Sequence, residues 1–90
     1  MSDAVLLSVA ITAAQHCGLQ PDKFHFEFYQ AKYSTVMSYE MNGVLHLNRY
    51  METHPCIVVG SIAYFTNFRN DRALDRVRAA RAERCCEGLE

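Results

Sequence analysis

Residues 37–48, MSYEMNGVLHLN, decide the fold, because polar and apolar residues alternate on both sides of an Asn-Gly pair. Such alternation predicts half-buried strands, and Asn-Gly is a strong signal for a hairpin turn. A two-residue turn would pair Tyr39 with His46, whereas a three-residue turn would pair Tyr39 with Leu45. We predict the three-residue turn, because it alone gathers the large apolar residues of both strands on one face.

The predicted register assigns each side chain of the hairpin to a face of the sheet. Tyr39 lies on the core face beside Leu45, and Met37 lies there beside Leu47. The side chains on the opposite face are Glu40, Val44, His46 and Asn48. We therefore expect the outer face of the hairpin to be polar and accessible to a partner.

The segment before the hairpin predicts another strand. Residues 24–30, FHFEFYQ, alternate strictly and place three Phe side chains on one face. Only Ala31 and Lys32 separate this strand from residues 33–40, so the two strands should form an antiparallel hairpin. Together the three strands are expected to form an antiparallel β-meander.

Residues 55–68, PCIVVGSIAYFTNF, fit either a helix or a fourth strand. The β-branched and aromatic residues favour a strand, whereas Thr53 followed by Pro55 is typical of a helix start. Periodicity alone does not separate the two structures in so short an apolar run. We predict a helix, with a four-stranded sheet as the alternative, because a small chain needs more than one helix to cover the aromatic face of its sheet.

Two further helices are predicted at the ends of the chain. Residues 3–17 follow Ser2, a favoured N-cap, and end at Gly18. Residues 70–87 consist of good helix formers and end at Gly88. The apolar face of the second helix is poor, so we expect it to pack only partly on its own domain. The residues predicted for that face are Leu74, Val77 and Cys85, with Arg81 between them.

The predicted architecture is one α+β domain over residues 1–88. An N-terminal helix precedes the meander, and the C-terminal helices pack on one face of the sheet. Leu89 and Glu90 resemble a cloning remnant, so the native chain is expected to end near Gly88. With 90 residues the core is small and only marginally stabilising, which makes a homodimer expected.

The N-terminal apolar run predicts neither export nor a membrane span. It lacks the basic flank of a signal peptide, and a span needs about 20 apolar residues. We therefore predict a cytoplasmic protein with no membrane partner. Cysteines in that compartment are expected to be thiols, and those of this chain are Cys17, Cys56, Cys85 and Cys86.

No motif predicts catalysis. The chain contains no HExxH, no G-x-S-x-G, no glycine-rich phosphate loop and no dinucleotide-binding fingerprint. We therefore predict no enzyme and no cofactor.

Cysteine and histidine pairs support only a third hypothesis, a small metal- or thiol-dependent protein. His16-Cys17 and Cys85-Cys86 are adjacent pairs, and neighbours on a helix point about 100° apart, which disfavours chelation. A nucleophilic Cys56 near His54 would need a third residue to orient the base. We expect no metal site and structural cysteines. His25 and His46, with two Glu side chains near them, are expected to form a solvated sheet face.

Arginine is concentrated near the C-terminus. Arg69, Arg72 and Arg76 line one side of the last predicted helix at positions i, i+3 and i+7. Arginine is favoured both in protein interfaces and in phosphate contacts. Because the net charge is −1 and acidic residues are interspersed, a protein partner is the stronger prediction.

The sequence thus predicts a small stand-alone binding protein that acts by protein–protein contact, without catalysis. By analogy of size, it suits a phage- or mobile-element-encoded inhibitor or modulator of host machinery. Nucleic-acid binding through the arginine-rich helix is the alternative. The predicted partner-binding residues are Arg69, Arg72, Arg76, Glu40 and His46.

Overall fold

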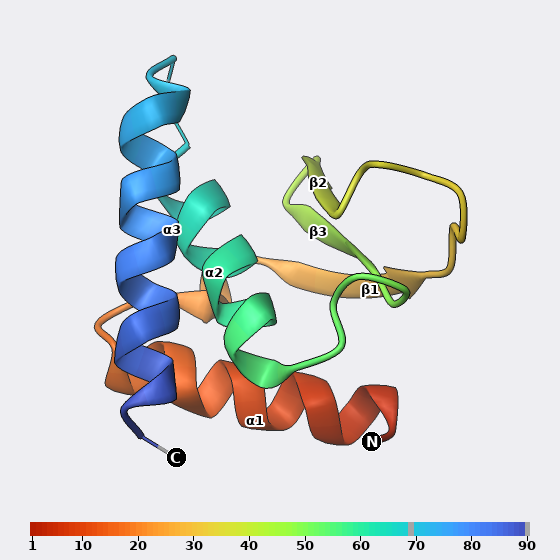
Figure 1. Ribbon diagram of the computed structural model, residues 1–90, viewed down its shortest axis with the longest axis horizontal. Helices are drawn as coiled ribbons and strands as arrows, with labels where there is room; N and C mark the ends of the chain where they lie inside the picture. The colour runs from red at the N-terminus through yellow and green to blue at the C-terminus, as the bar shows by residue number, and fades with distance from the viewer. Residues whose placement is uncertain (69, 90) are drawn as a thin grey trace.

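The protein combines three helices with a three-stranded sheet within residues 1–68 and 70–89, which the computed structural model describes. The helices are α1 (Asp3–His16), α2 (Pro55–Thr66) and α3 (Arg72–Glu87), and the strands are β1 (His25–Tyr29), β2 (Ser38–Met41) and β3 (Val44–Asn48). A short 3-10 helix, η1 (Pro21–Lys23), leads into β1. The sheet lies on one side of α2 and α3 on the other, while α1 runs across their lower ends (Figure 1). The predicted α+β class is confirmed.

Local capping interactions begin the first two helices. The Ser2 hydroxyl accepts a hydrogen bond from the N–H of Val5 at 3.2 Å. Pro55 occupies the first position of α2, and His54 Nδ1 accepts the N–H of Cys56 at 3.1 Å. The helix predicted in residues 55–68 is confirmed, and the four-stranded alternative is wrong. None of the helices in the described ranges is both long and apolar enough for a transmembrane segment.

The sheet is mixed, which corrects the predicted antiparallel meander. The strand order is β1-β3-β2, with β1 parallel to β3 and β2 antiparallel to β3. In the parallel pair, Phe26 lies beside Leu45 and Phe28 beside Leu47. The aromatic face of β1 therefore continues the apolar face of β3, although β1 and β2 do not pair.

A buried asparagine explains why Ala31 and Lys32 do not form a hairpin turn. Asn48 is fully buried, and its Nδ2 donates to the carbonyls of Ala31 at 3.1 Å and Val36 at 3.2 Å. Its Oδ1 accepts the N–H of Ala31 at 3.2 Å. Because these bonds hold both ends of a loop between β1 and β2, the chain crosses over before β2 begins.

The hairpin register also corrects the prediction. Tyr39 pairs with His46, and the turn contains only Asn42 and Gly43, whose φ angles are 53° and 80°. Two successive positive φ values define the type I′ turn, whose twist matches that of the strands. Tyr39 therefore points to the outer face, where its ring stacks on His46 with centroids 4.4 Å apart. In the predicted register the Tyr39 ring would be buried on the core face. In the structure its contact is the stacking on His46 instead.

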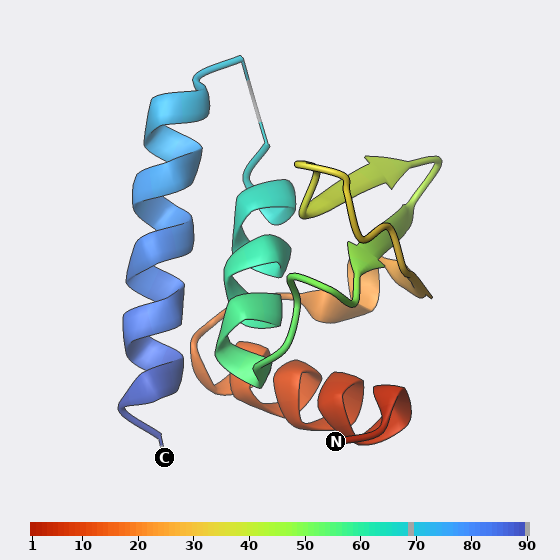
Figure 2. The ribbon, with the colours of Figure 1, turned by 45° about the vertical axis from the view of Figure 1, so that its right-hand side comes forward.

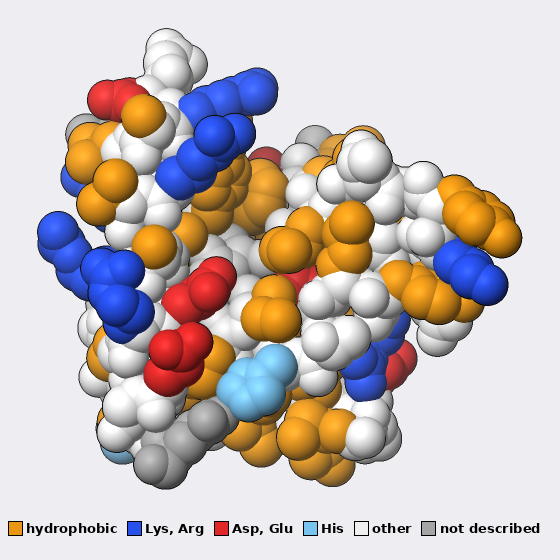
Figure 3. Space-filling view, in the orientation of Figure 1, with side chains coloured by type: hydrophobic (Ala, Val, Ile, Leu, Met, Phe, Trp, Pro, Cys, Tyr) orange, Lys and Arg blue, Asp and Glu red, His pale blue; other side chains and the backbone are white. Residues whose placement is uncertain are grey.

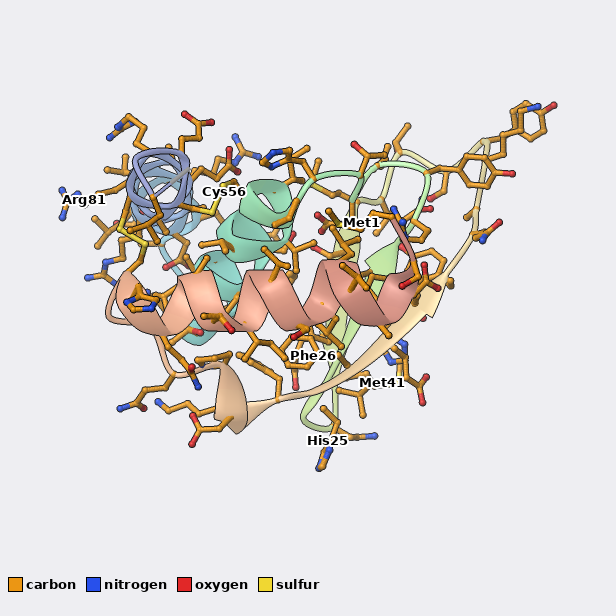
Figure 4. The ribbon with its side chains drawn as sticks, turned by 90° about the horizontal axis from the view of Figure 1, so that it is seen from below. Met1, His25, Phe26, Met41, Cys56 and Arg81 are labelled. Atoms are coloured by element: carbon orange, nitrogen blue, oxygen red, sulfur yellow. A yellow bond between two sulfur atoms is a disulfide. The ribbon has the colours of Figure 1, made fainter. Side chains whose placement is uncertain are left out.

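The core lies between the inner face of the sheet, α1 and α2. Its largest fully buried apolar side chains are Leu6, Leu45, Leu47, Val58, Val59 and Ile62. Phe26 points from β1 towards α1, whereas His25 and Met41 lie on the side of the sheet away from α1 (Figure 4). The outer face consequently carries no helix.

Helix α3 packs along α2 (Figure 2), but on a face other than the predicted one. Leu74 is 42% and Val77 51% exposed, and the buried side chains of α3 are instead Asp75, Ala82 and Cys86. The buried face of α3 was mispredicted because its apolar stripe contains only two large apolar residues, Leu74 and Val77.

Two disulfides anchor α3, which corrects the prediction of four thiols. Cys17, directly after α1, is bonded to Cys85, and Cys56 in the first turn of α2 is bonded to Cys86. The last turn of α3 is thereby joined to both other helices (Figure 4).

Candidate functional site

A groove of about 660 Å³ lies between β2, α2 and α3. One wall is formed by β2 and the loop before it, residues 35–40, and the other by α3. The exposed surface in this region is hollowed between α3 and the sheet, with apolar side chains inside, basic ones on the upper part of α3 and acidic ones below (Figure 3).

Two arginines form the basic part of the groove. Arg72 and Arg76 both line it from α3, one helical turn apart, so they share a face of the helix. Neither guanidinium has an ion-pair partner among the described residues. Both arginines are exposed and therefore able to pair with an acidic ligand.

Three aromatic side chains form the apolar part. Tyr64, Phe65 and Phe68 line the groove near the end of α2. Their ring centroids lie 5.0 Å apart for Tyr64 and Phe65, and 6.0 Å apart for Phe65 and Phe68. Phe68 is 51% exposed. Tyr64 and Phe65 are partly buried. A partly exposed aromatic cluster beside exposed arginines has the composition of a protein-interface core.

The β2 wall is an edge strand with free backbone groups. The N–H of Asn48 donates to the Met37 carbonyl at 2.9 Å. Because hydrogen-bonded pairs alternate in an antiparallel ladder, Tyr39 also bonds to β3, whereas the backbone groups of Ser38 and Glu40 point away from it. These groups form an unpaired strand edge along the groove.

The groove also holds two acidic side chains, Glu40 and Glu83. Glu40 Oε1 accepts the N–H of Gly43 at 2.8 Å, which fixes this carboxylate over the turn. The Glu83 side chain lies against Gly60, where a Cβ would have no room. Burial, and then the charge of Glu87, raise the pKa of Glu83.

Beneath the groove, a buried carboxyl is connected to it through two serines. Glu52 is fully buried, and the Ser61 hydroxyl donates to its Oε1. Ser38 Oγ lies 3.2 Å from Ser61 Oγ, and both serines line the groove. Glu52 Oε2 has no hydrogen-bond partner among the described residues. Burial raises the pKa of Glu52 to about 7, helped by the charge of Glu83 and opposed by the Ser61 bond.

The serine–carboxyl pair lacks the other parts of a hydrolytic site. A serine nucleophile needs donors that stabilise the oxyanion besides a base. Ser61 is 6% exposed and lies in the middle of α2, where backbone N–H groups bond within the helix. Ser61 is therefore poorly placed for acyl transfer. Its hydroxyl instead connects the buried Glu52 carboxyl to Ser38 at the groove by hydrogen bonds.

The structure brings together three of the five predicted partner-binding residues. Arg72, Arg76 and Glu40 all line the groove. His46 lies on the opposite face of the sheet, because it pairs with Tyr39. Arg69 lies outside the described residues. The aromatic residues of α2 were missed as site residues, because their sequence pattern also fits a buried helix.

The outer face of the sheet holds a smaller polar cluster. His46 Nδ1 lies 3.6 Å from Glu27 Oε2, and Tyr39 stacks between His46 and Tyr29. The predicted grouping of Glu40 with His46 on this face is wrong, because neighbouring strand residues alternate between faces.

The cysteine hypotheses have no thiol available. All four cysteines are in disulfides, and His54 caps α2 instead of activating Cys56. Within residues 1–68 and 70–89, no three His, Cys, Asp or Glu side chains are grouped so that they could hold a metal ion.

The comparisons with known proteins found no matching family, no matching curated protein and no matching solved structure. The functional argument therefore depends on the groove and its chemistry.

Proposed function

We propose that this chain is a small non-catalytic binding protein that acts by protein–protein contact through the groove between β2 and α3. The observation that carries the proposal is the pair Arg72 and Arg76. These arginines have no ion-pair partner among the residues that the structure describes, and they face an exposed strand edge across an aromatic cluster. Arginine and aromatic side chains supply most of the binding energy in protein interfaces. The two arginines and Phe68 are exposed, whereas Phe65 also packs against the core.

Charge reversal of the two groove arginines tests the proposal. Wild-type protein and the Arg72→Glu/Arg76→Glu variant are each used as bait in extracts of the native host, after nuclease treatment. We expect a protein that the wild type retains and the variant does not. Because both side chains are exposed and without ion pairs, the variant should keep the wild-type circular dichroism spectrum.

A matched control lies on the same helix. Arg78 and Arg81 line the surface of α3 beside Cys17 and Asn67, away from the groove. The Arg78→Glu/Arg81→Glu variant has the same change in net charge and should still retain the partner. If both variants lose it, or neither does, the groove is not the contact surface.

Nucleic-acid binding through α3 is the second candidate, because this helix carries arginines on two surfaces. Arg72 and Arg76 line the groove, and Arg78 and Arg81 line the surface beside Cys17. This candidate requires that affinity fall steeply with salt, with a slope set by the number of phosphates contacted. The arginines are divided between two faces, and the groove also holds the carboxylates of Glu40 and Glu83. This distribution weakens the nucleic-acid candidate relative to the protein-binding one.

Within the binding function, we propose an inhibitor or modulator of the phage or mobile-element type. Two disulfides in 90 residues give a rigid scaffold, and rigidity lowers the entropic cost of binding. A homodimer is part of the same proposal. Its surface would include the exposed apolar side chains of α1, Val5 and Val9, and analytical ultracentrifugation measures the oligomeric state.

The disulfides change the proposed compartment. Disulfides persist in oxidising compartments and are rare in the cytosol, so we propose an oxidising compartment in place of the predicted cytoplasm. Protein isolated under alkylating conditions is expected to have a mass lower by two hydrogens for each of the two disulfides. Four alkylated thiols would support the cytoplasmic prediction instead.

A further inference from the structure

We infer that the groove binds an extended acidic segment of the partner, which adds a strand to the free edge of β2 and places acidic side chains against Arg72 and Arg76. This inference rests on the proposed protein-binding function and names the kind of segment that is bound.

The strand edge supplies the main-chain part of recognition. Ser38 and Glu40 present their N–H and C=O groups away from β3, and the groove lies along this edge. Extended peptides commonly bind by adding a strand to such an edge, with main-chain hydrogen bonds supplying affinity. Only an extended backbone can satisfy these alternating groups.

The opposite wall determines which side chains the segment carries. Arg72 and Arg76 are separated by about 6 Å along α3, at 1.5 Å per residue. Side chains on one face of an extended strand repeat every 6.6 Å or so. These two spacings run in different directions, because β2 lies across α3 rather than along it (Figure 2). The added strand therefore meets both arginines where it crosses α3, and one or two acidic side chains pair with them there. Charge-assisted bonds between such groups are about twice as strong as neutral ones.

The length and the apolar part of the groove limit the segment further. The strand-side wall of the groove is formed by residues 35–40, so the added strand pairs with a short edge. The aromatic rings of Tyr64, Phe65 and Phe68 line the same space, so an apolar side chain of the segment fits there. The expected segment is thus short, with one or two acidic residues on the arginine side and an apolar residue next to them.

The acidic groups in the groove argue against a continuous polyanion. Glu40 and Glu83 line the groove together with the two arginines, so its formal charge is balanced. A nucleic-acid backbone would place phosphates beside these carboxylates as well as beside the arginines. A segment whose acidic residues are confined to the arginine end avoids that repulsion.

Selection from a display library of random eight-residue peptides tests the inference, with the wild-type protein as target. We expect enrichment of peptides that carry at least one Asp or Glu with an apolar residue nearby. A synthetic peptide of the enriched sequence should bind Arg72→Glu/Arg76→Glu about tenfold more weakly or worse. It should bind the Arg78→Glu/Arg81→Glu control within twofold of the wild type.

Each other outcome is decisive. Enrichment of basic peptides, the absence of enrichment, or equal binding to both variants would overturn the inference. If no peptide is enriched but a folded partner still depends on Arg72 and Arg76, the inference fails and the proposed function stands. If single-stranded oligonucleotide binds the groove arginines and peptides do not, both fail.

Discussion

Gly43 has a φ angle of 80° in the turn between β2 and β3, a conformation that costs an L-residue about 1–2 kcal/mol. A Cβ at this position would have no atom within 4 Å, so a substitution here affects the backbone conformation and not the packing. We expect Gly43→Ala to lower the free energy of unfolding by about 1 kcal/mol. This is less than the full strain, because alanine also restricts the unfolded chain and so offsets part of it. Urea denaturation with intact disulfides measures this change.

Gly88 provides the control at the residue scale. Its φ angle is −70°, which alanine adopts without strain, and a Cβ there would lie 3.4 Å from the nearest atom, the Cys85 carbonyl oxygen. Gly88→Ala should therefore change the free energy of unfolding by less than about 0.5 kcal/mol. Equal effects at Gly43 and Gly88 would contradict the type I′ turn and the register that follows from it.

Glu52 makes the stability of the protein depend on pH. Burial raises the pKa of this carboxyl from its ordinary value of 4.5 to about 7 in the folded protein. Folding therefore favours the protonated form, and the stabilisation present below pH 4.5 is lost as the pH rises to about 7. At about 1.4 kcal/mol for each pH unit, the loss is on the order of 3 kcal/mol.

Glu52→Gln tests this dependence, because the amide does not titrate and still accepts the Ser61 hydrogen bond. Unfolding free energies of the wild type and the variant are measured at pH 5 and pH 8. We expect the wild type to lose about 3 kcal/mol relative to the variant over that range. Equal losses in both proteins would show that Glu52 is ionised alike in the folded and unfolded states.

At the scale of elements, the disulfides hold α3 in place. Its buried side chains are only Asp75, Ala82 and Cys86, which provide little apolar burial. The two disulfides close segments of 68 and 30 residues, and each is expected to stabilise the fold by about 3–4 kcal/mol. Replacing the pair Cys17 and Cys85 by serine should therefore cost slightly more than replacing Cys56 and Cys86.

Hydrogen exchange after reduction shows whether α3 depends on these bonds. With a dithiol reductant, we expect amides of α3 to exchange much faster, while those of β3 stay protected because Leu45 and Leu47 remain fully buried. The protein with both disulfides intact, in the same buffer without reductant, is the control. Unchanged protection of α3 after complete reduction would contradict this dependence.

The elements differ in how much of them the sequence predicts. The helices carry local signals, such as caps and proline, and lie close to where they were predicted. The Asn-Gly pair likewise marks the position of the turn, but the turn has two residues in place of the three predicted. The parallel pairing of β1 with β3 depends on Asn48, whose role in closing a distant loop has no local signal. The register was mispredicted because apolar burial was weighed above turn geometry at an edge strand, where Tyr39 finds its contact on the outer face.

At the scale of the whole molecule, the candidate site joins segments that are far apart in the sequence. Arg72 and Arg76 were predicted as one side of a helix and Glu40 as part of a sheet face, and their common groove depends on the packing of α3 along α2. The aromatic floor and the Glu52–Ser61 contact were not foreseen, because each also fits an ordinary buried position. His46 was assigned to the same surface only through the incorrect register.

The most direct test of the account is amide hydrogen exchange of β2 with and without the selected acidic peptide. Strand addition should slow exchange of the Ser38 and Glu40 amides, which point away from β3. The Tyr39 amide already bonds to β3 and is the internal control, with little change expected. If a bound peptide leaves exchange at Ser38 and Glu40 unchanged, the groove does not bind an added strand and the central claim is contradicted.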